Sequence, residues 1–162
     1  MPNFNQRSID NLKTCDFLLQ NLFNEVIQRI DCSIICGHRG KEEQNEAFDK
    51  KASKVRYPDS KHNSFPSMAV DVYPYPYDWE AGRWSIEKLV DEMRVYSIDH
   101  EAGASMLARV LSNYKKLYFF GGIVKGIAWE LGIKVRWGGD WDSDNDLEDQ
   151  NFNDLVHWEV KK

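Results

Sequence analysis

The sequence predicts an α+β fold in which a small antiparallel sheet is flanked by helices. Three observations support this prediction. The chain has 162 residues, 42% of them hydrophobic and 13% aromatic, which is enough for one hydrophobic core and unlike a disordered chain. Short strand-like runs are bounded by Gly, Pro or polar residues, and longer runs with helical spacing separate them. No repeat, low-complexity tract or linker divides the chain, so we expect one domain over residues 1–162.

Two helices are expected in the first third of the chain. Apolar residues recur at helical spacing over residues 10–30, and Ser8 stands where an N-cap would stand. A second helix is expected to begin at Lys41, because acidic residues in its first turn interact favourably with the helix dipole. Residues 50–59 are polar and basic, which predicts a loop.

Four short strands are expected, at residues 33–36, 68–72, 134–137 and 155–160. In the second strand, Ala69 and Asp71 fall on the same face, because side chains alternate along a strand. Pro74 and Pro76 end this strand, since proline removes backbone donors. The aromatic residues of segment 73–79 either line a groove or cover the core.

A helical insertion is expected over residues 85–116, which are mostly polar. Two helical segments are expected there, near residues 86–96 and 102–114. A third helix is expected over residues 117–131, with Gly132 as a natural C-cap.

The composition limits the expected partners. The net charge is −5 and Lys and Arg are scattered, so we expect no nucleic-acid partner. No apolar stretch approaches the roughly 20 residues that span a bilayer, so we expect no membrane partner. The N-terminus lacks the positive end and apolar run of a signal peptide.

The three cysteines, Cys15, Cys32 and Cys36, form no regular disulfide framework. Cys32 and Cys36 flank an apolar pair, which favours small buried strand residues over a zinc-binding pair. This usage suits synthesis in a reducing compartment.

The acidic segment 140–149 has alternating Asp residues, which suggests a calcium loop. An EF-hand is excluded, because its sixth position requires Gly and its twelfth Glu, where this chain has Asn145 and Asn151. A looser calcium site and a solvated acidic loop both remain as alternatives.

Two distant stretches carry the residues with the clearest chemistry. His62 and Asp71 lie nine positions apart, and His157 is preceded by Asp154 and followed by Glu159. Two His and one Asp suffice to hold a catalytic zinc with water in the fourth position. A nearby carboxylate that is not a ligand could then act as general base. Each His taken singly is more simply explained as a structural residue.

One arginine and two other histidines are the remaining candidates for such a site. Arg39 is expected on a loop between a strand and a helix, where it either contacts substrate or is solvated. His38 and His100 do not stand in a motif with other candidate ligands, and we interpret both as surface or loop residues.

Four segments together resemble one family of zinc peptidases. Residues 60–71 resemble its Ser-x-His … Ala-x-Asp motif, residues 154–159 its acidic residue three positions before the last His, and residues 39–44 its Arg … Gln segment. Residues 137–141 resemble the Trp-Gly-Gly-Asp-Trp loop of its phage endopeptidase branch. This is the VanY-like family of D-alanyl-D-alanine carboxypeptidases and L-alanyl-D-glutamate endopeptidases, which includes the vancomycin-resistance dipeptidases and several phage endolysins.

The resemblance implies a role for each matching residue. In the commoner first motif the step from His to Asp is shorter than the nine positions found here, but a longer form is similar to some phage members. The implied roles are Zn²⁺ ligation by His62, Asp71 and His157, general base catalysis by Asp154, oxyanion stabilisation by Arg39, substrate contacts by Gln44 and Ser60, and either an alternative base or a partner of a zinc-bound His at Glu159.

The function implied is hydrolysis of the stem peptide of bacterial peptidoglycan. Cleavage between L-alanine and D-glutamate by a phage endolysin is the leading expectation, and a D-alanyl-D-alanine carboxypeptidase is the alternative. A non-catalytic module for wall-peptide binding or virion structure is the hypothesis from another class. We expect a monomer that accumulates in the host cytoplasm before lysis and reaches the wall through a holin-made breach.

Overall fold

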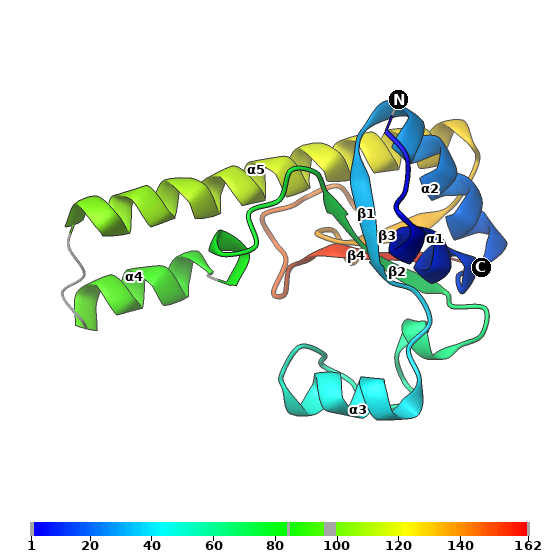
Figure 1. Cartoon of the computed structure of the whole chain (residues 1–162), viewed down its shortest axis with the longest axis horizontal. Helices are drawn as coiled ribbons and strands as arrows, with labels where there is room; N and C mark the ends of the chain where they lie inside the picture. The colour runs from blue at the N-terminus through cyan, green and yellow to red at the C-terminus, as the bar shows by residue number, and fades with distance from the viewer. Residues whose placement is uncertain (1, 84, 96–99, 162) are drawn as a thin grey trace.

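The structure, a computed structural model, describes residues 2–83, 85–95 and 100–161 and confirms the α+β prediction (Figure 1). The helices are α1 (Gln6–Lys13), α2 (Phe17–Arg29), α3 (Lys41–Asp49), α4 (Ile86–Val95) and α5 (His100–Glu130), with two short 3₁₀ helices, η1 (Lys61–Asn63) and η2 (Ala81–Arg83). The strands are β1 (Cys32–Cys36), β2 (Ala69–Pro74), β3 (Val135–Gly138) and β4 (Asp154–Val160).

The strands form one antiparallel sheet with the order β1-β2-β4-β3. All four strands are confirmed, with ends within two residues of the predicted ones. The central pair, β2 and β4, is close in space although far apart in sequence, and its register sets Asp71 opposite His157. The sheet therefore joins the two stretches that carry the predicted metal ligands.

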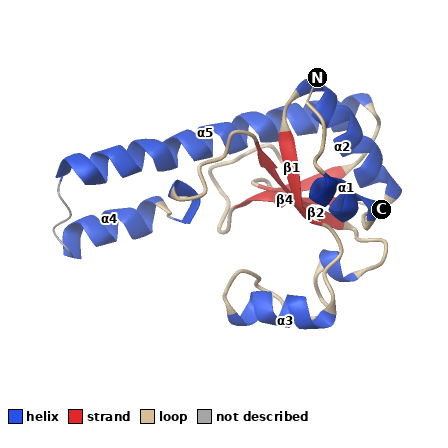
Figure 2. Cartoon of the chain, in the orientation of Figure 1, coloured by secondary structure: helices blue, strands red, loops and turns tan. Residues whose placement is uncertain are grey.

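Helices cover one face of the sheet and leave room for a site on the other. Helices α1, α2 and the C-terminal half of α5 lie against the sheet, while α3 lies on the opposite side from α5 (Figure 2). Phe23 of α2 packs edge-on against Trp158 of β4, and Trp137 of β3 stacks on the same indole. Gly121 of α5 allows this packing, because a Cβ there would lie 2.6 Å from the Trp137 ring.

The predicted single helix over residues 10–30 was wrong, because the chain breaks between α1 and α2. Asn5 and Asp16 cap the two helices, and Ser8 is not an N-cap. The Ser8 hydroxyl is buried and accepts a hydrogen bond from the backbone of Ile34 in β1. The break follows from tertiary pairing, since Asp16 donates its backbone N–H to the carbonyl of Ser67. Periodicity within one segment cannot reveal such a contact.

The predicted boundary between helices at residues 114–117 was also wrong, because α5 runs without interruption for 31 residues. Lys115 and Lys116 continue the helix, as good helix formers do. The N-terminal half of α5 extends beyond the sheet and pairs with α4 as a helical hairpin (Figure 1). Gly132 follows the helix with φ +68°, which confirms the predicted C-cap.

The hairpin and the preceding η2 share a small core of their own, built from Ala81, Leu89 and Val110. The hairpin corresponds to the region predicted as an insertion, residues 85–116. Residues 84 and 96–99 lie outside the described residues. Across the described part of the chain, no helix is both long and apolar enough to span a membrane.

Candidate metal centre and its cleft

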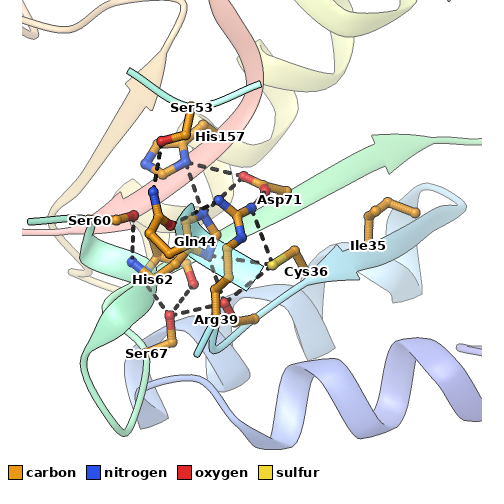
Figure 3. A network of polar contacts seen from close by, with 12 residues as sticks. Ile35, Cys36, Arg39, Gln44, Ser53, Ser60, His62, Ser67, Asp71 and His157 are labelled. Carbon is orange, nitrogen blue, oxygen red and sulfur yellow. Dashed lines mark hydrogen bonds and ion pairs between the residues drawn. The ribbon is translucent and has the colours of Figure 1, made fainter. Parts of the chain in front are cut away.

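Three different elements place the three predicted metal ligands. Asp71 comes from β2, His157 from β4, and His62 from η1 (Figure 3). The Ser60 side chain caps η1 by accepting a hydrogen bond from the backbone N–H of His62. The backbone of Arg39 donates to the His62 carbonyl at 2.8 Å, which ties η1 to the loop after β1.

The ligand atoms converge on one point. His62 Nε2 lies 3.2 Å from Asp71 Oδ1 and 3.3 Å from His157 Nδ1, and His157 Nδ1 lies 3.1 Å from the same Asp71 oxygen (Figure 3). Ligands at about 2.0–2.1 Å from a tetrahedral zinc lie about 3.3 Å from one another. The triangle therefore has the dimensions of three ligands around one zinc ion.

Each imidazole is also oriented by its other nitrogen. His62 Nδ1 lies 2.7 Å from the carbonyl of Gly37, and His157 Nε2 lies 3.5 Å from Glu159 Oε2. Donation to these oxygens fixes the tautomers and leaves His62 Nε2 and His157 Nδ1 free to bind a cation. Glu159 is in turn paired with the guanidinium of Arg136. The donor set and its supporting contacts fit zinc.

The electrostatics of the centre favour a positive charge. Burial opposes protonation of His62, but the neighbouring Asp71 carboxylate outweighs it and raises the His62 pKa to about 10. Burial likewise opposes protonation of His157, yet its hydrogen bond with Asp71 raises the pKa of that imidazole. The two imidazoles overcome the effect of burial on Asp71 and lower its pKa. A proton or a metal cation is therefore stabilised at this point.

Arg39 lies beside the ligand triangle. Its Nη2 lies 3.2 Å from Asp71 Oδ2, and its Nη1 donates to Gln44 Oε1 at 3.2 Å. Gln44 is fully buried and donates to Ser53 Oγ and to the carbonyl of Val55. Gln44 thus holds both Arg39 and the loop that follows α3, so any influence on substrate passes through these neighbours.

A cleft of about 600 Å³ opens over the centre. One side is the segment 52–62, and the other is the acidic loop with Trp141 and Phe152. Arg39, Ser60, the three predicted ligands and Asp154 all line this cleft. The structure therefore brings together every predicted site residue except Gln44, which lies behind Arg39.

Asp154 and Glu159 differ in their surroundings. Burial raises the pKa of Asp154, and the nearby Asp71 charge adds to this. Glu159 is nearly inaccessible, and its two carboxylate oxygens face His157 and Arg136. Asp154 is therefore better placed to accept a proton, while Glu159 is placed to orient His157.

Cys36 belongs to the site, although the sequence predicted only a small buried strand residue. Its Sγ accepts from Arg39 Nη2 at 3.5 Å and lies 3.9 Å from His62 Nδ1 (Figure 3). Cys36, His62 and Asp71 also form a group in which one ligand atom from each lies within 4.8 Å of the others. Cys36 lies next to an irregularity in the pairing of β1 with β2, between Ile34 and Cys36. The signal in the sequence that could have assigned Cys36 to the site is that it lies three positions before Arg39.

The acidic loop adjoins the cleft. Ligand atoms of Asp140, Asp142 and Asp144 lie within 4.8 Å of one another. Asp140 is buried and accepts from the ammonium of Lys125 at 2.5 Å, and Lys125 also donates to Asn145. Calcium binding by this loop stays a prediction.

The other two histidines lie outside the triangle. His38 lies on the loop after β1, as predicted, and its ring packs on Phe65. His100 begins α5, and its side chain lies outside the described residues.

Comparison with known proteins adds one finding. No family model matches this chain, and no curated protein matches it. Among solved structures, the chain is similar to an L-Ala D-Glu endopeptidase, ChiX of Serratia marcescens, with a TM-score of 0.57 and 19% sequence identity. The match covers 98% of this chain and 90% of that one. The two proteins therefore share a fold over nearly their whole length.

Proposed function

We propose that this protein is a zinc-dependent peptidase that cleaves the stem peptide of bacterial peptidoglycan, between L-alanine and D-glutamate. The observation that carries the proposal is the convergence of His62, Asp71 and His157 at the base of an open cleft whose wall includes Arg39 and Asp154. The fold shared with a protein described as an L-Ala D-Glu endopeptidase supports the choice of bond.

His62, Asp71 and His157 would hold the zinc, and Glu159 would keep His157 in the ligating tautomer. A bound zinc supplies Lewis acidity, which lowers the pKa of water toward neutrality and polarises a carbonyl. The chain's own task is then to place a peptide carbonyl in the cleft and to move protons.

In the proposed reaction, a carboxylate oxygen of Asp154 takes the proton of the attacking water and later delivers it to the leaving amine. The raised pKa of Asp154 suits both steps, because the group accepts a proton more readily than an exposed Asp. The Arg39 guanidinium, held by Gln44 and Asp71, stabilises negative charge that develops on the carbonyl oxygen.

The test is digestion of purified peptidoglycan with and without a zinc chelator, followed by mass spectrometry of the products. We expect chelator-sensitive release of peptides that begin with D-glutamate. Release of free D-alanine instead would move the assignment to a D-alanyl-D-alanine carboxypeptidase. Zinc-loaded protein that leaves several wall chemotypes uncut would favour a non-catalytic wall-peptide binding module.

We extend the proposal to a phage endolysin that acts as a monomer. The Trp-Gly-Gly-Asp-Trp loop supports this extension, since its Trp141 lines the cleft with a ring centroid 5.5 Å from that of His157. Expression in a bacterial host checks it. We expect lysis only when the inner membrane is permeabilised, whereas lysis from intact cells would contradict delivery through a holin-made breach.

A further inference from the structure

A second, smaller cavity adjoins the proposed reaction site. It has a volume of about 170 Å³ and lies between the helical hairpin and the first residues of β4. Three tyrosines, Tyr73, Tyr77 and Tyr114, contribute to its wall, together with Asn153 and Asp154. Tyr73 and Tyr77 belong to segment 73–79, whose aromatic residues were expected either to line a groove or to cover the core, whereas Tyr114 had no predicted role.

The cavity and the main cleft share one wall residue, Asp154. Asp154 lines both spaces, so a group in the cavity lies next to the proposed general base. Tyr73 follows Asp71 by two positions in β2, which places both side chains on the same face of the sheet. A substrate bound across the centre would therefore extend into this cavity on one side of the scissile bond.

The walls of the cavity are firmly held. The rings of Tyr73, Tyr77 and Trp79 pack against one another with centroid separations of 4.4–5.0 Å. The backbone of Gly82 lies against the side chain of Tyr77, since a Cβ on Gly82 would lie 2.5 Å from the Tyr77 hydroxyl oxygen. Asn113 of α5 fixes the same segment, because it exchanges two hydrogen bonds with the backbone of Asp78. The cavity is a preformed space.

The charges around the two spaces differ. The lining of the main cleft carries both signs of charge, with four cationic residues, Arg39, Lys54, Lys61 and Arg136, and six carboxylates, Asp59, Asp71, Asp142, Asp149, Asp154 and Glu159. Among the described residues that line the cavity there is no Lys or Arg, and Asp154 is the one carboxylate. Burial raises the pKa of Tyr73 and of Tyr77, so both phenols are neutral. An anionic group would find repulsion and no counter-charge in the cavity.

We propose that this cavity is a subsite for the uncharged muramyl sugar on the acyl side of the scissile bond. This inference rests on the proposed function. In the stem peptide, D-glutamate and the residues after it bear carboxylates, whereas L-alanine is joined to the sugar through an uncharged amide. A methyl group would leave most of the space empty, and a cavity of roughly 150 Å³ accommodates a six-membered ring such as benzene. The tyrosine rings offer apolar faces to such a ring.

The test compares two substrates that differ only in the sugar. Zinc-loaded protein is given N-acetylmuramyl-L-alanyl-D-glutamyl-L-lysine and, separately, a plain peptide in which the same tripeptide carries only an N-D-lactyl group. For the wild type we expect kcat/KM to be roughly tenfold higher for the muramyl substrate, mainly through a lower KM. In Asn153→Trp, which would block the exposed rim, we expect kcat/KM for the muramyl substrate to fall to that of the plain peptide measured with the same variant.

Two further variants and a binding measurement complete the test. Asn153→Ala leaves the rim open and keeps the advantage, and Tyr77→Leu removes one aromatic wall and reduces it. Calorimetry measures binding of N-acetylmuramyl-L-alanine amide to chelator-stripped protein, where no bond is cleaved. We expect the affinity to rank the wild type and the variants in the same order as the advantage of the muramyl substrate. Equal cleavage of both substrates by the wild type, or an advantage that survives in both Asn153→Trp and Tyr77→Leu, overturns the subsite alone. Cleavage of neither substrate overturns the proposed function and the subsite with it.

Discussion

At the scale of single residues, each imidazole of the candidate metal centre has one nitrogen fixed by a neighbour and the other directed at Asp71. The neighbours are the Gly37 carbonyl for His62 and the Glu159 carboxylate for His157. Such partners matter because they set the tautomer on which ligation depends. The two acidic residues around His157 therefore have separable tasks, proton transfer for Asp154 and orientation for Glu159.

Asp154→Asn is expected to retain zinc while lowering kcat. The amide keeps the shape of the side chain but cannot accept the proton of the attacking water, and general acid–base catalysis contributes about 10²–10⁴-fold to rate. Zinc content by metal analysis and kcat on a defined stem peptide are measured on the same sample. Wild-type kcat in this variant would refute the assignment of the base.

The pH profile gives an independent reading of Asp154. The carboxyl must be unprotonated to act as base, and burial holds its pKa above the ordinary 3.8. The acid limb of the wild-type kcat profile is therefore expected at higher pH than an exposed Asp would give, with activity lost as pH falls through that pKa. The residual activity of Asp154→Asn is expected to lack this limb.

Glu159→Gln is expected to weaken zinc binding by about 10–100-fold, since the charged partner of His157 and the counter-ion of Arg136 are both lost. The zinc affinity of chelator-stripped protein, measured by competition with a chromophoric chelator, checks this. Glu148→Gln on the exposed acidic loop is the matched control and should bind zinc as the wild type does. An unchanged affinity in Glu159→Gln would mean that the carboxylate does not support His157.

The candidate site was predictable at this scale where residue type and motif spacing agree. His62, Asp71, His157, Asp154 and Arg39 were all singled out from the sequence, and the structure brings them to one cleft. Cys36 was missed because its contact with His62 joins segments 26 positions apart, which strand periodicity does not encode.

At the scale of elements, the helical hairpin extends beyond the sheet and packs around a core separate from the main one. Its own core is small, and Arg109 of α5 links it to Asp78 and Glu80 in the segment after β2. The four strands and α3 were predictable, because turn residues and helix-start residues mark their ends. The break between α1 and α2 and the continuity of α5 were not, since both depend on contacts between distant segments.

Leu89→Ala is expected to destabilise the protein by roughly 2–4 kcal/mol, because Leu89 is 2% exposed and its removal leaves a cavity in the hairpin core. Leu111→Ala, a truncation of an exposed leucine on α5, should change stability by only about 0.5 kcal/mol. Urea denaturation followed by circular dichroism measures both. Equal losses in the two variants would show that α4 and α5 do not pack as described.

At the scale of the whole molecule, the fold brings residues that are far apart in the sequence to one point. Asp71 and His157 are separated by 86 positions, yet the register of β2 and β4 sets them directly opposite each other. The sequence contained the ligand types, but the pairing of the two central strands is a long-range property that composition and spacing do not specify. The shared fold with an endopeptidase and the open cleft then support one functional conclusion.

The measurement that tests this conclusion most directly is zinc stoichiometry and peptide hydrolysis on the same sample, during stripping and reloading of the metal. We predict about one zinc per chain, with hydrolysis of an L-alanyl-D-glutamyl peptide that falls and returns in proportion to bound zinc. Full hydrolysis by metal-free protein would contradict the account, and so would stoichiometric zinc in a protein that cleaves no stem peptide.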